Sequence, residues 1–178
     1  ETLREQVPEL VFRSTFIVGH PGETDEDFEE LCDFVRWAEL DHVGVFLYSH
    51  EEGTHSGEMD ELVPAKTARA RHRKLMRLQR GISRRKHKAR VGTELEVLVD
   101  GVSDESELLL QGRWWGQAPE VDGTVQLANG TAERGELRRA LVTQAADYDL
   151  VADLLDEEGR RDAPTPAPRR VRLPTVSG

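Results

Sequence analysis

The hydrophobic and polar positions along the chain follow two different periods. Residues 16–18 form a short apolar run typical of a buried strand, and a loop rich in glycine follows at 19–22. Apolar residues then recur at steps of three and four, which predicts an amphipathic helix over about 24–39. A second apolar run at 43–48 predicts another strand, and residues 1–12 suit a short helix or loop. This order predicts an α/β fold with a parallel sheet.

The loop after the first strand stands where ligands bind in α/β folds, beyond the carboxyl end of a strand. It lacks the usual nucleotide-binding patterns of glycine and lysine, and any strand–helix unit can carry such a loop. Thr24 suits the N-cap of the following helix, with Asp27 three residues later in the position of a capping-box acid. We interpret the acids of this first turn as stabilising the helix dipole rather than binding metal.

A long helix is predicted from Pro64 to about residue 89, because proline is favoured in a first helical turn. Its apolar positions form one narrow stripe, and most other positions are basic: the stripe is Leu75, Leu78 and Ile82, with Met76 beside it. The basic side chains allow two interpretations, a phosphate-binding face or pairing with the acidic segments on either side.

From residue 91 the pattern changes to short apolar segments separated by turn residues. Five short strands in about 65 residues predict a small closed or nearly closed barrel: 95–99, 108–112, 124–127, 137–142 and 150–154. Trp114 and Trp115 are adjacent, so on a strand they point to opposite faces, one into the core and one outward. A bulge or turn that buries both is the alternative. Residues 156–178, with four prolines and no apolar period, predict a disordered tail.

The net charge of −10 hides a strong segregation of charge. Residues 1–65 contain 3 basic and 17 acidic side chains, residues 66–90 contain 12 basic and no acidic ones, and residues 91–155 contain 4 basic and 13 acidic ones. No apolar run approaches the ~18 residues of a membrane span and no signal peptide is visible, so we expect a soluble, cytoplasmic protein. The first residue is Glu1 and a strand follows soon after, which we interpret as a fragment.

Two loops resemble those of the radical S-adenosylmethionine methylthiotransferases. Residues 13–24 are similar to that family's Arg-x-x-x-Ile-x-Gly-Phe-Pro-Gly-Glu-Thr, with His20 in place of the Phe. Residues 48–54 are similar to its Tyr-Ser-Pro-Glu-Glu-Gly-Thr, with His50 in place of the Pro. Residues 112–123 resemble the pattern Gly-Arg-x-x-x-x-Ala-Pro-Glu-x-Asp-Gly of the TRAM domain of the same enzymes.

The resemblance implies an architecture of α/β followed by all-β. Residues 1–63 would be the C-terminal part of a radical S-adenosylmethionine partial (β/α) barrel, and 64–90 a basic linker helix. Residues 91–155 would be a five-stranded, OB-like TRAM barrel, and 156–178 the disordered tail.

The resemblance also implies cofactors and site residues. Ile17 and Gly19 would approach the adenosine of S-adenosylmethionine, with Phe46 on the next strand. Arg13 is a further candidate, although a buried arginine paired to an acid is equally consistent. The family also uses two 4Fe-4S clusters, which need thiolate ligands. Cys32 is the one cysteine and sits on a predicted helix, so we expect no cluster, no metal site and no activity from this chain alone.

Members of this family modify either adenosine in tRNA or an aspartate of small-subunit ribosomal protein twelve. The acidic balance of residues 91–155 repels RNA and attracts a basic protein. The sequence at 118–123 is also closer to the ribosomal-protein branch. We therefore expect a C-terminal fragment of an aspartate methylthiotransferase for ribosomal protein twelve, bound through the acidic TRAM domain. Alternatives are a fragment of a tRNA methylthiotransferase or a stand-alone RNA-binding module that uses the basic helix.

Three residues are candidates for binding the partner. Trp114 or Trp115, whichever points outward, is suited to anchor it, and Arg113 precedes them in the same motif. His50 and His55 lie near Glu51 and Glu52, but such residues on a surface loop are usually just solvated. A structural alternative remains for the whole chain, in which the open sheet edge of a truncated product associates non-specifically.

Overall fold

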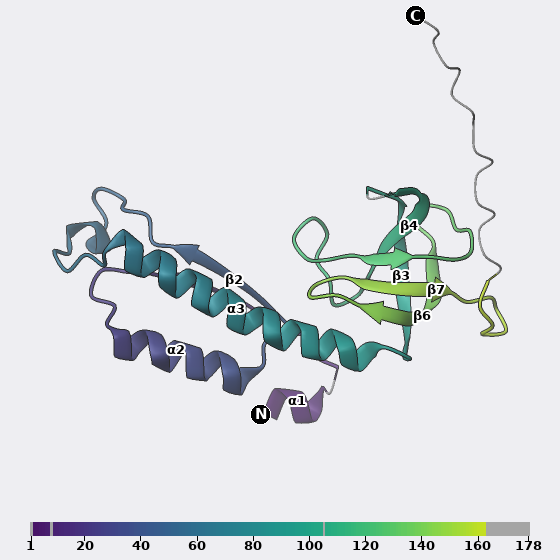
Figure 1. The fold of residues 1–178 in the computed structure, drawn as a ribbon, viewed down its shortest axis with the longest axis horizontal. Coiled ribbons are helices and arrows are strands. Elements are labelled where there is room, and N and C mark those ends of the chain that lie inside the picture. Colours follow the sequence, from purple (N-terminus) through teal and green to yellow (C-terminus); the bar gives the residue numbers. More distant parts are fainter. Residues whose placement is uncertain (1, 8, 105, 163–178) are drawn as a thin grey trace, which may run out of the picture. The chain divides into compact units, whose positions relative to one another are not determined.

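The computed structural model describes residues 2–7, 9–104 and 106–162 of the chain (Figure 1). The described residues fall into two compact units, which divide between Lys86 and His87. No helix in these three ranges is long and apolar enough to cross a membrane.

The first unit is an α/β unit built on two parallel strands. Its elements are α1 (Thr2–Gln6), β1 (Arg13–Val18), α2 (Asp25–Ala38), β2 (His42–Leu47), the 3-10 helix η1 (His55–Glu58) and most of α3 (Ala65–Arg90). β1 and β2 pair in register from Arg13 opposite His42 to Val18 opposite Leu47. The predicted strands, helices and parallel sheet are therefore confirmed to within one to three residues.

Helices α2 and α3 supply the hydrophobic core of this unit together with one face of the strand pair. The fully buried members come from all four elements: Val18, Phe28, Cys32, Val35, Val45, Leu75 and Ile82. Leu78 and Met76 pack against this core from its edge, as the apolar stripe predicts. Figure 1 shows α2 and α3 running side by side. Because both helices lie on the same side of the strands, the other side of the sheet carries exposed apolar residues.

The buried face of α3 is only partly apolar, and its polar residues make specific contacts. Gln79 is 2% exposed and donates its side-chain amide to the backbone oxygen of Leu40 at 2.9 Å. This bond ties α3 to the end of α2 and explains how a helix with few apolar positions is fixed in place, since a buried amide without a partner would be costly.

The second unit is a closed five-stranded barrel, as predicted. Its strands are β3 (Glu94–Ser103), β4 (Ser106–Trp114), β5 (Val125–Leu127), β6 (Leu137–Ala145) and β7 (Leu150–Leu154), closed in the order β3-β4-β5-β7-β6. The β5–β7 pair is parallel and the other pairs are antiparallel. The interior is lined by small and branched residues, which include Val97, Val99, Val125, Ala140, Val142, Leu150 and Leu154.

Residues 156–162 differ from the predicted disorder. Asp156 accepts hydrogen bonds from Glu158 and Arg160, and Asp162 lies 2.9 Å from the guanidinium of Arg138 on β6. These contacts fold the segment into a turn against the barrel, because charged side chains supply the partners that its few apolar residues cannot. The remainder of the predicted tail, 163–178, lies outside the described residues.

Candidate functional site

Two of the predicted cofactor-binding residues lie together on the open face of the sheet. Ile17 of β1 stands directly opposite Phe46 of β2 in the parallel register. They are 58% and 61% exposed, whereas their neighbours Val18 and Val45 point into the core. Large apolar side chains that meet on an exposed sheet face need a covering group, and the flat base of a nucleoside is one that fits.

Gly19 begins the loop after β1 and adopts a left-handed backbone with φ +79°. Its backbone N–H donates to the carboxylate of Glu23, and a Cβ at this position would stand 2.5 Å from the Cβ of Ala68 on α3. The glycine is therefore needed for packing against the helix, independently of any ligand. Gly22, at φ +82°, donates its N–H to the backbone oxygen of Glu61 at 2.8 Å.

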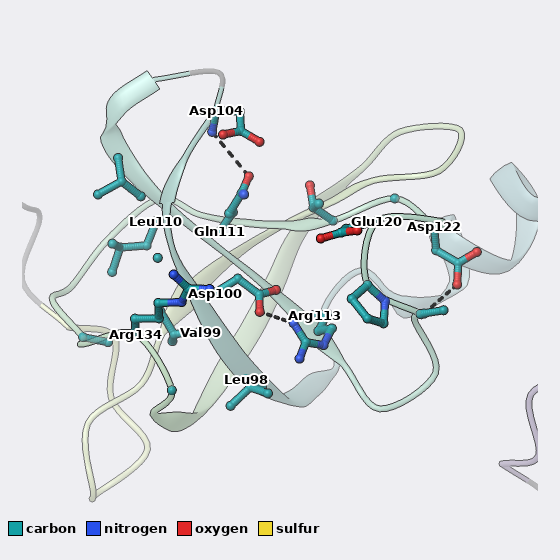
Figure 2. Close-up of a pocket in the computed structure, with 18 residues that line it drawn as sticks. Leu98, Val99, Asp100, Asp104, Leu110, Gln111, Arg113, Glu120, Asp122 and Arg134 are labelled. Carbon is teal, nitrogen blue, oxygen red and sulfur yellow. Dashed lines mark hydrogen bonds and ion pairs between the residues drawn. The ribbon is translucent and has the colours of Figure 1, made fainter.

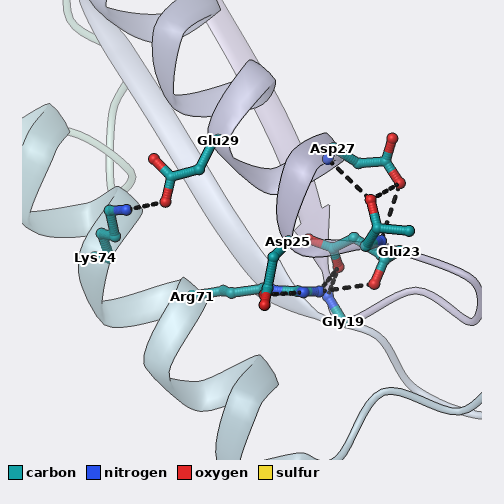
Figure 3. A network of polar contacts seen from close by, with 8 residues as sticks. Gly19, Glu23, Asp25, Asp27, Glu29, Arg71 and Lys74 are labelled. Carbon is teal, nitrogen blue, oxygen red and sulfur yellow. Dashed lines mark hydrogen bonds and ion pairs between the residues drawn. The ribbon is translucent and has the colours of Figure 1, made fainter.

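Arg71 holds this loop on α3 (Figure 3). Its side chain is 7% exposed and its guanidinium lies 3.4 Å from the carboxylate of Glu23, which is 12% exposed. It also donates to the Glu23 backbone oxygen at 3.1 Å and to Asp25 at 2.7 Å. The Glu23 carboxylate thus joins Arg71 to the N–H of Gly19, and this buried network fixes the conformation of the loop.

His20 connects the two loops that resemble the methylthiotransferase family. Its Nδ1 lies 2.8 Å from the Pro21 carbonyl oxygen, and because a carbonyl can only accept, Nδ1 carries a proton and donates. Its Nε2 lies 2.8 Å from the Ser56 hydroxyl in the second loop region, and its ring meets Tyr48 edge-on. A phenylalanine, as in the family pattern, could make the ring contact but neither hydrogen bond.

Arg13 is exposed, so the alternative of a buried arginine at this position is wrong. Arg13 lies at the start of β1, four residues before Ile17, and the alternation of side chains along a strand places the two on the same face.

The one cysteine of the chain does not suit metal binding. Cys32 is fully buried, and this burial raises the pKa of its thiol, which disfavours the thiolate that metal binding requires. Among the described residues no three His, Cys, Asp or Glu side chains gather as a metal site.

The capping box predicted at the start of α2 is present. Asp27 donates its backbone N–H to the Thr24 hydroxyl at 3.1 Å, and the Thr24 backbone N–H donates to the Asp27 carboxylate at 2.9 Å. The backbone and then the side-chain hydrogen bond from Thr24 hold the pKa of Asp27 below its ordinary value of 3.8.

In the barrel, the two adjacent tryptophans divide between core and surface as predicted, although Trp115 lies in the turn after β4 and not on the strand. Trp114 is 4% exposed and Trp115 is 62% exposed, and their rings meet edge-on with centroids 5.2 Å apart. The alternative in which both are buried is therefore wrong. The guanidinium of Arg90 stacks 4.0 Å from the centre of the Trp114 ring. A Cβ on Gly116 would lie 2.1 Å from that ring, so the ring occupies the space above this glycine.

The loop after β4 is held by its own side chains. Gln117 accepts a hydrogen bond from the Trp114 N–H and donates to the Gly123 carbonyl oxygen at 2.7 Å. The Asp122 carboxylate accepts from the Ala118 N–H at 2.7 Å. The side chains of Gln117 and Asp122 therefore shape this loop through hydrogen bonds to its own backbone.

A groove of about 1080 Å³ opens beside this loop (Figure 2). Its charged lining consists of four carboxylates and two guanidinium groups: Asp100, Asp104, Glu120, Asp122, Arg113 and Arg134. Arg113 forms an ion pair with Asp100, so these two charges neutralise each other within the groove. The groove therefore presents a negative surface with exposed carboxylates at Asp104 and Glu120.

Comparison with known proteins agrees with this division of the chain. Residues 91–155, which contain the barrel, match the family model of the TRAM domain. The ribosomal protein uS12 methylthiotransferase RimO of Sorangium cellulosum is 62% identical over 157 residues, which are 88% of this chain and 32% of that protein. The protein of the same name from Bdellovibrio bacteriovorus is 47% identical over 87% of this chain and 34% of its own length. That from Myxococcus xanthus is 47% identical over 93% of this chain and 37% of its own length.

The chain is thus similar over most of its length to methylthiotransferases, and its barrel region matches the TRAM domain. These relatives are the proteins called RimO, named for the ribosomal-protein branch that the sequence predicts. The chain spans about a third of the length of these relatives.

Several site features were not predicted from the sequence. The ion pair of Arg71 with Glu23 and the bridge from His20 to Ser56 join residues 48 and 36 positions apart, and no local pattern indicates such pairs. The acidic lining of the groove was expected only as a regional charge balance. The gathering of Asp100, Asp104 and Glu120 at one opening depends on how the barrel closes.

Proposed function

We propose that this chain is the C-terminal portion of a methylthiotransferase that modifies an aspartate of ribosomal protein uS12. In it, the sheet of the first unit forms part of the S-adenosylmethionine pocket and the barrel recognises the protein substrate. The observation that carries the proposal is an acidic barrel groove in a chain 62% identical to a protein named for this activity. A ribosomal substrate is consistent with a cytoplasmic enzyme.

The open sheet face supports the cofactor role. Ile17 and Phe46 offer an exposed apolar surface suited to an adenine ring, and Gly19 lies one residue beyond β1, where the loop begins. Arg13, on the same face, would act at the other end of the strand. S-adenosylmethionine supplies the radical and the methyl group in this family, and the residues of this chain would contribute binding and orientation.

The iron–sulfur clusters of the family do not fit this part of the protein. Cys32 is the one cysteine in the sequence, it is buried in the core, and its raised pKa disfavours ligation. Since the chain spans about a third of its relatives, we place the cluster ligands outside it and assign no catalytic residue within it. We also keep the boundaries 1–63, 64–90, 91–155 and 156–178 as the domain division, with the third supported by the TRAM match.

The substrate role of the barrel rests on charge and on one exposed aromatic residue. Four carboxylates line the groove, and a basic protein segment would pair with them as it enters. Trp115 is 62% exposed and would anchor such a segment through its ring. Arg113, held by Asp100, would position that carboxylate rather than contact the partner.

The tRNA-modifying branch and the stand-alone RNA module remain the alternatives. For a tRNA enzyme, an RNA-binding barrel would need a positive surface, since phosphate neutralisation dominates RNA affinity. The barrel region instead contains 4 basic and 13 acidic residues, which favours the protein substrate.

Binding of purified uS12 to this chain, measured at two salt concentrations with tRNA as competitor, tests the proposal. We expect uS12 binding that weakens with salt and is unaffected by tRNA. The variant Asp104→Asn with Glu120→Gln should weaken it about ten-fold, because two charge pairs of roughly 0.5–1 kcal/mol each are lost.

A charge-matched control removes two exposed carboxylates that do not line the groove, Glu30→Gln and Glu52→Gln in the first unit. We expect this control to bind uS12 as the unmodified chain does. If both variants lose affinity for uS12 equally, the loss reflects the net charge of the chain and not the groove. If tRNA displaces uS12 from the groove, the chain is assigned to the tRNA-modifying branch instead.

A further inference from the structure

Six exposed basic side chains form a single row along α3. They follow one another at steps of three and four residues: Lys66, Arg69, Arg73, Arg77, Arg80 and Arg84. This spacing is the helical period, so the side chains lie one above another on one face. The buried residues of the helix, such as Leu75 and Gln79, occupy the opposite face. We call these six residues the outer basic row.

Four of the other six basic residues of α3 have a different role. Arg71 pairs with Glu23 and Asp25, Lys74 with Glu29, Arg85 with Glu39 and Lys86 with Asp41. These are the acids of the first unit that the sequence placed opposite the basic segment. The interpretation that the basic segment pairs with neighbouring acids is therefore confirmed for these four side chains, which are distinct from the outer basic row.

Helix stability does not account for the outer basic row. Like charges three or four residues apart destabilise a helix by about 0.2–0.5 kcal/mol per pair, and the row contains five such neighbouring pairs. The first turn of α3 contains no acid, although that end of the helix dipole favours one, and Lys66 stands there instead. A row kept against these local costs indicates a negatively charged partner.

We propose that the outer basic row binds the phosphate backbone of an RNA. The row extends 18 residues, about 27 Å at 1.5 Å per residue, and a nucleic-acid duplex of that length carries on the order of 16 phosphate charges. Five of the six members of the row are arginines, and the planar guanidinium group of arginine can bind two phosphate oxygens at once.

The surroundings of the row favour RNA over other polyanions. A helix that lies on an anionic membrane buries apolar residues beside its basic ones, but Leu75 and Ile82 of α3 are buried in the core. The choice of RNA as the polyanion rests on the proposed function, since a ribosomal protein substrate is surrounded by RNA.

The test measures binding of the full chain to a fluorescent 20-base-pair RNA duplex between 50 and 300 mM salt. The variant Arg69→Gln, Arg73→Gln, Arg77→Gln should lose at least about ten-fold in affinity, with a slope of log affinity against log salt smaller by about 2–3. A charge-matched control, Arg36→Gln, Arg139→Gln, Arg160→Gln, removes three exposed arginines that already pair with acids. It should change affinity less than about two-fold.

A second variant separates charge from folding. Arg69→Lys, Arg73→Lys, Arg77→Lys keeps the charge of the row and should keep the salt slope of the unmodified chain. The proposal is overturned if the chain does not bind the duplex, if both glutamine variants lose affinity equally, or if polyglutamate or anionic vesicles compete as well as RNA at equal charge. This measurement contains no uS12, so a failure to bind RNA would leave the proposed function standing. A failure of the chain to bind uS12 would likewise leave RNA binding by the outer basic row untouched.

Discussion

Gly19 and Ala68 lie so close together that a Cβ at Gly19 would stand 2.5 Å from the Cβ of Ala68. The first residue belongs to the loop after β1 and the second to the first turns of α3. Their contact seats the loop of the proposed cofactor pocket directly on the helix that carries the outer basic row. The geometry of that loop therefore depends on packing as well as on its own sequence.

Gly19→Ala should destabilise the first unit by about 2–4 kcal/mol, the sum of the left-handed backbone and the overpacking against Ala68. Gly53→Ala is the matched control, since Gly53 has φ +76° with open space around it and meets only the first cost. Hydrogen exchange of core amides in β1 and α3 measures both. Adding Ala68→Gly to Gly19→Ala should recover part of the loss, and equal losses in Gly19→Ala and Gly53→Ala would contradict the packing argument.

Arg71→Met should destabilise the first unit by about 3 kcal/mol, because it leaves the Glu23 carboxylate buried without its cation. Adding Glu23→Gln should restore much of that stability, as the uncompensated charge is then gone. Lys74→Met, which breaks the exposed pair with Glu29, should cost less than about 1 kcal/mol. Urea unfolding followed by Trp37 fluorescence compares the variants, and an Arg71→Met effect no larger than that of Lys74→Met would exclude a buried network.

The elements of both units could be predicted from the sequence because each has a strong local period. Residues 24–39 begin with a capping box and repeat at helical steps, and the actual helix α2 spans Asp25–Ala38. Trp114 and Trp115 divide between core and surface as the alternation of a strand predicts, although Trp115 itself lies in the turn that follows β4.

The contacts between segments could not be predicted in the same way. His20 reaches Ser56 only because two loops come together in the fold, and Gly19 needs its lack of a side chain because of Ala68 on a distant helix. The outer basic row could be predicted only in part. Its spacing was present in the sequence and a helical projection would have found it, but the pairing of Arg71 and Lys86 with acids required the structure.

The capping box of α2 predicts a defined pH dependence. The hydrogen bonds from Thr24 hold the pKa of Asp27 below 3.8, so its folded pKa lies below its unfolded pKa. The stabilisation is present above the unfolded pKa and is lost as the pH falls through the folded one. Asp27→Asn should remove this part of the acid-side slope of stability against pH.

Titration of the Asp27 carboxyl by NMR checks the cause directly. Thr24→Ala removes the hydroxyl hydrogen bond to Asp27 but keeps the backbone one, so it should raise the pKa of Asp27 only part of the way toward 3.8. Through loss of the cap it should also destabilise the helix by about 1 kcal/mol. Asp156 is an internal control, because its pKa is lowered by hydrogen bonds from Arg160 in the other unit and should not change. An Asp27 pKa unaffected by Thr24→Ala would mean that the hydroxyl makes no contribution and that the backbone N–H of residue 24 alone stabilises the carboxylate.

The two tryptophans of the barrel should separate stability from partner binding. Trp114→Ala should destabilise the barrel by about 3–5 kcal/mol, because it empties a buried site and removes the stacking partner of Arg90. Trp115→Ala should leave the unfolding midpoint within about 0.5 kcal/mol of the unmodified chain, since its ring is 62% exposed. The same change should weaken uS12 binding at least about five-fold, a loss of roughly 1 kcal/mol that is modest for an aromatic anchor. If Trp115→Ala binds uS12 with unchanged affinity while remaining folded, the exposed ring is no part of the recognition surface, and the acidic groove alone must account for binding.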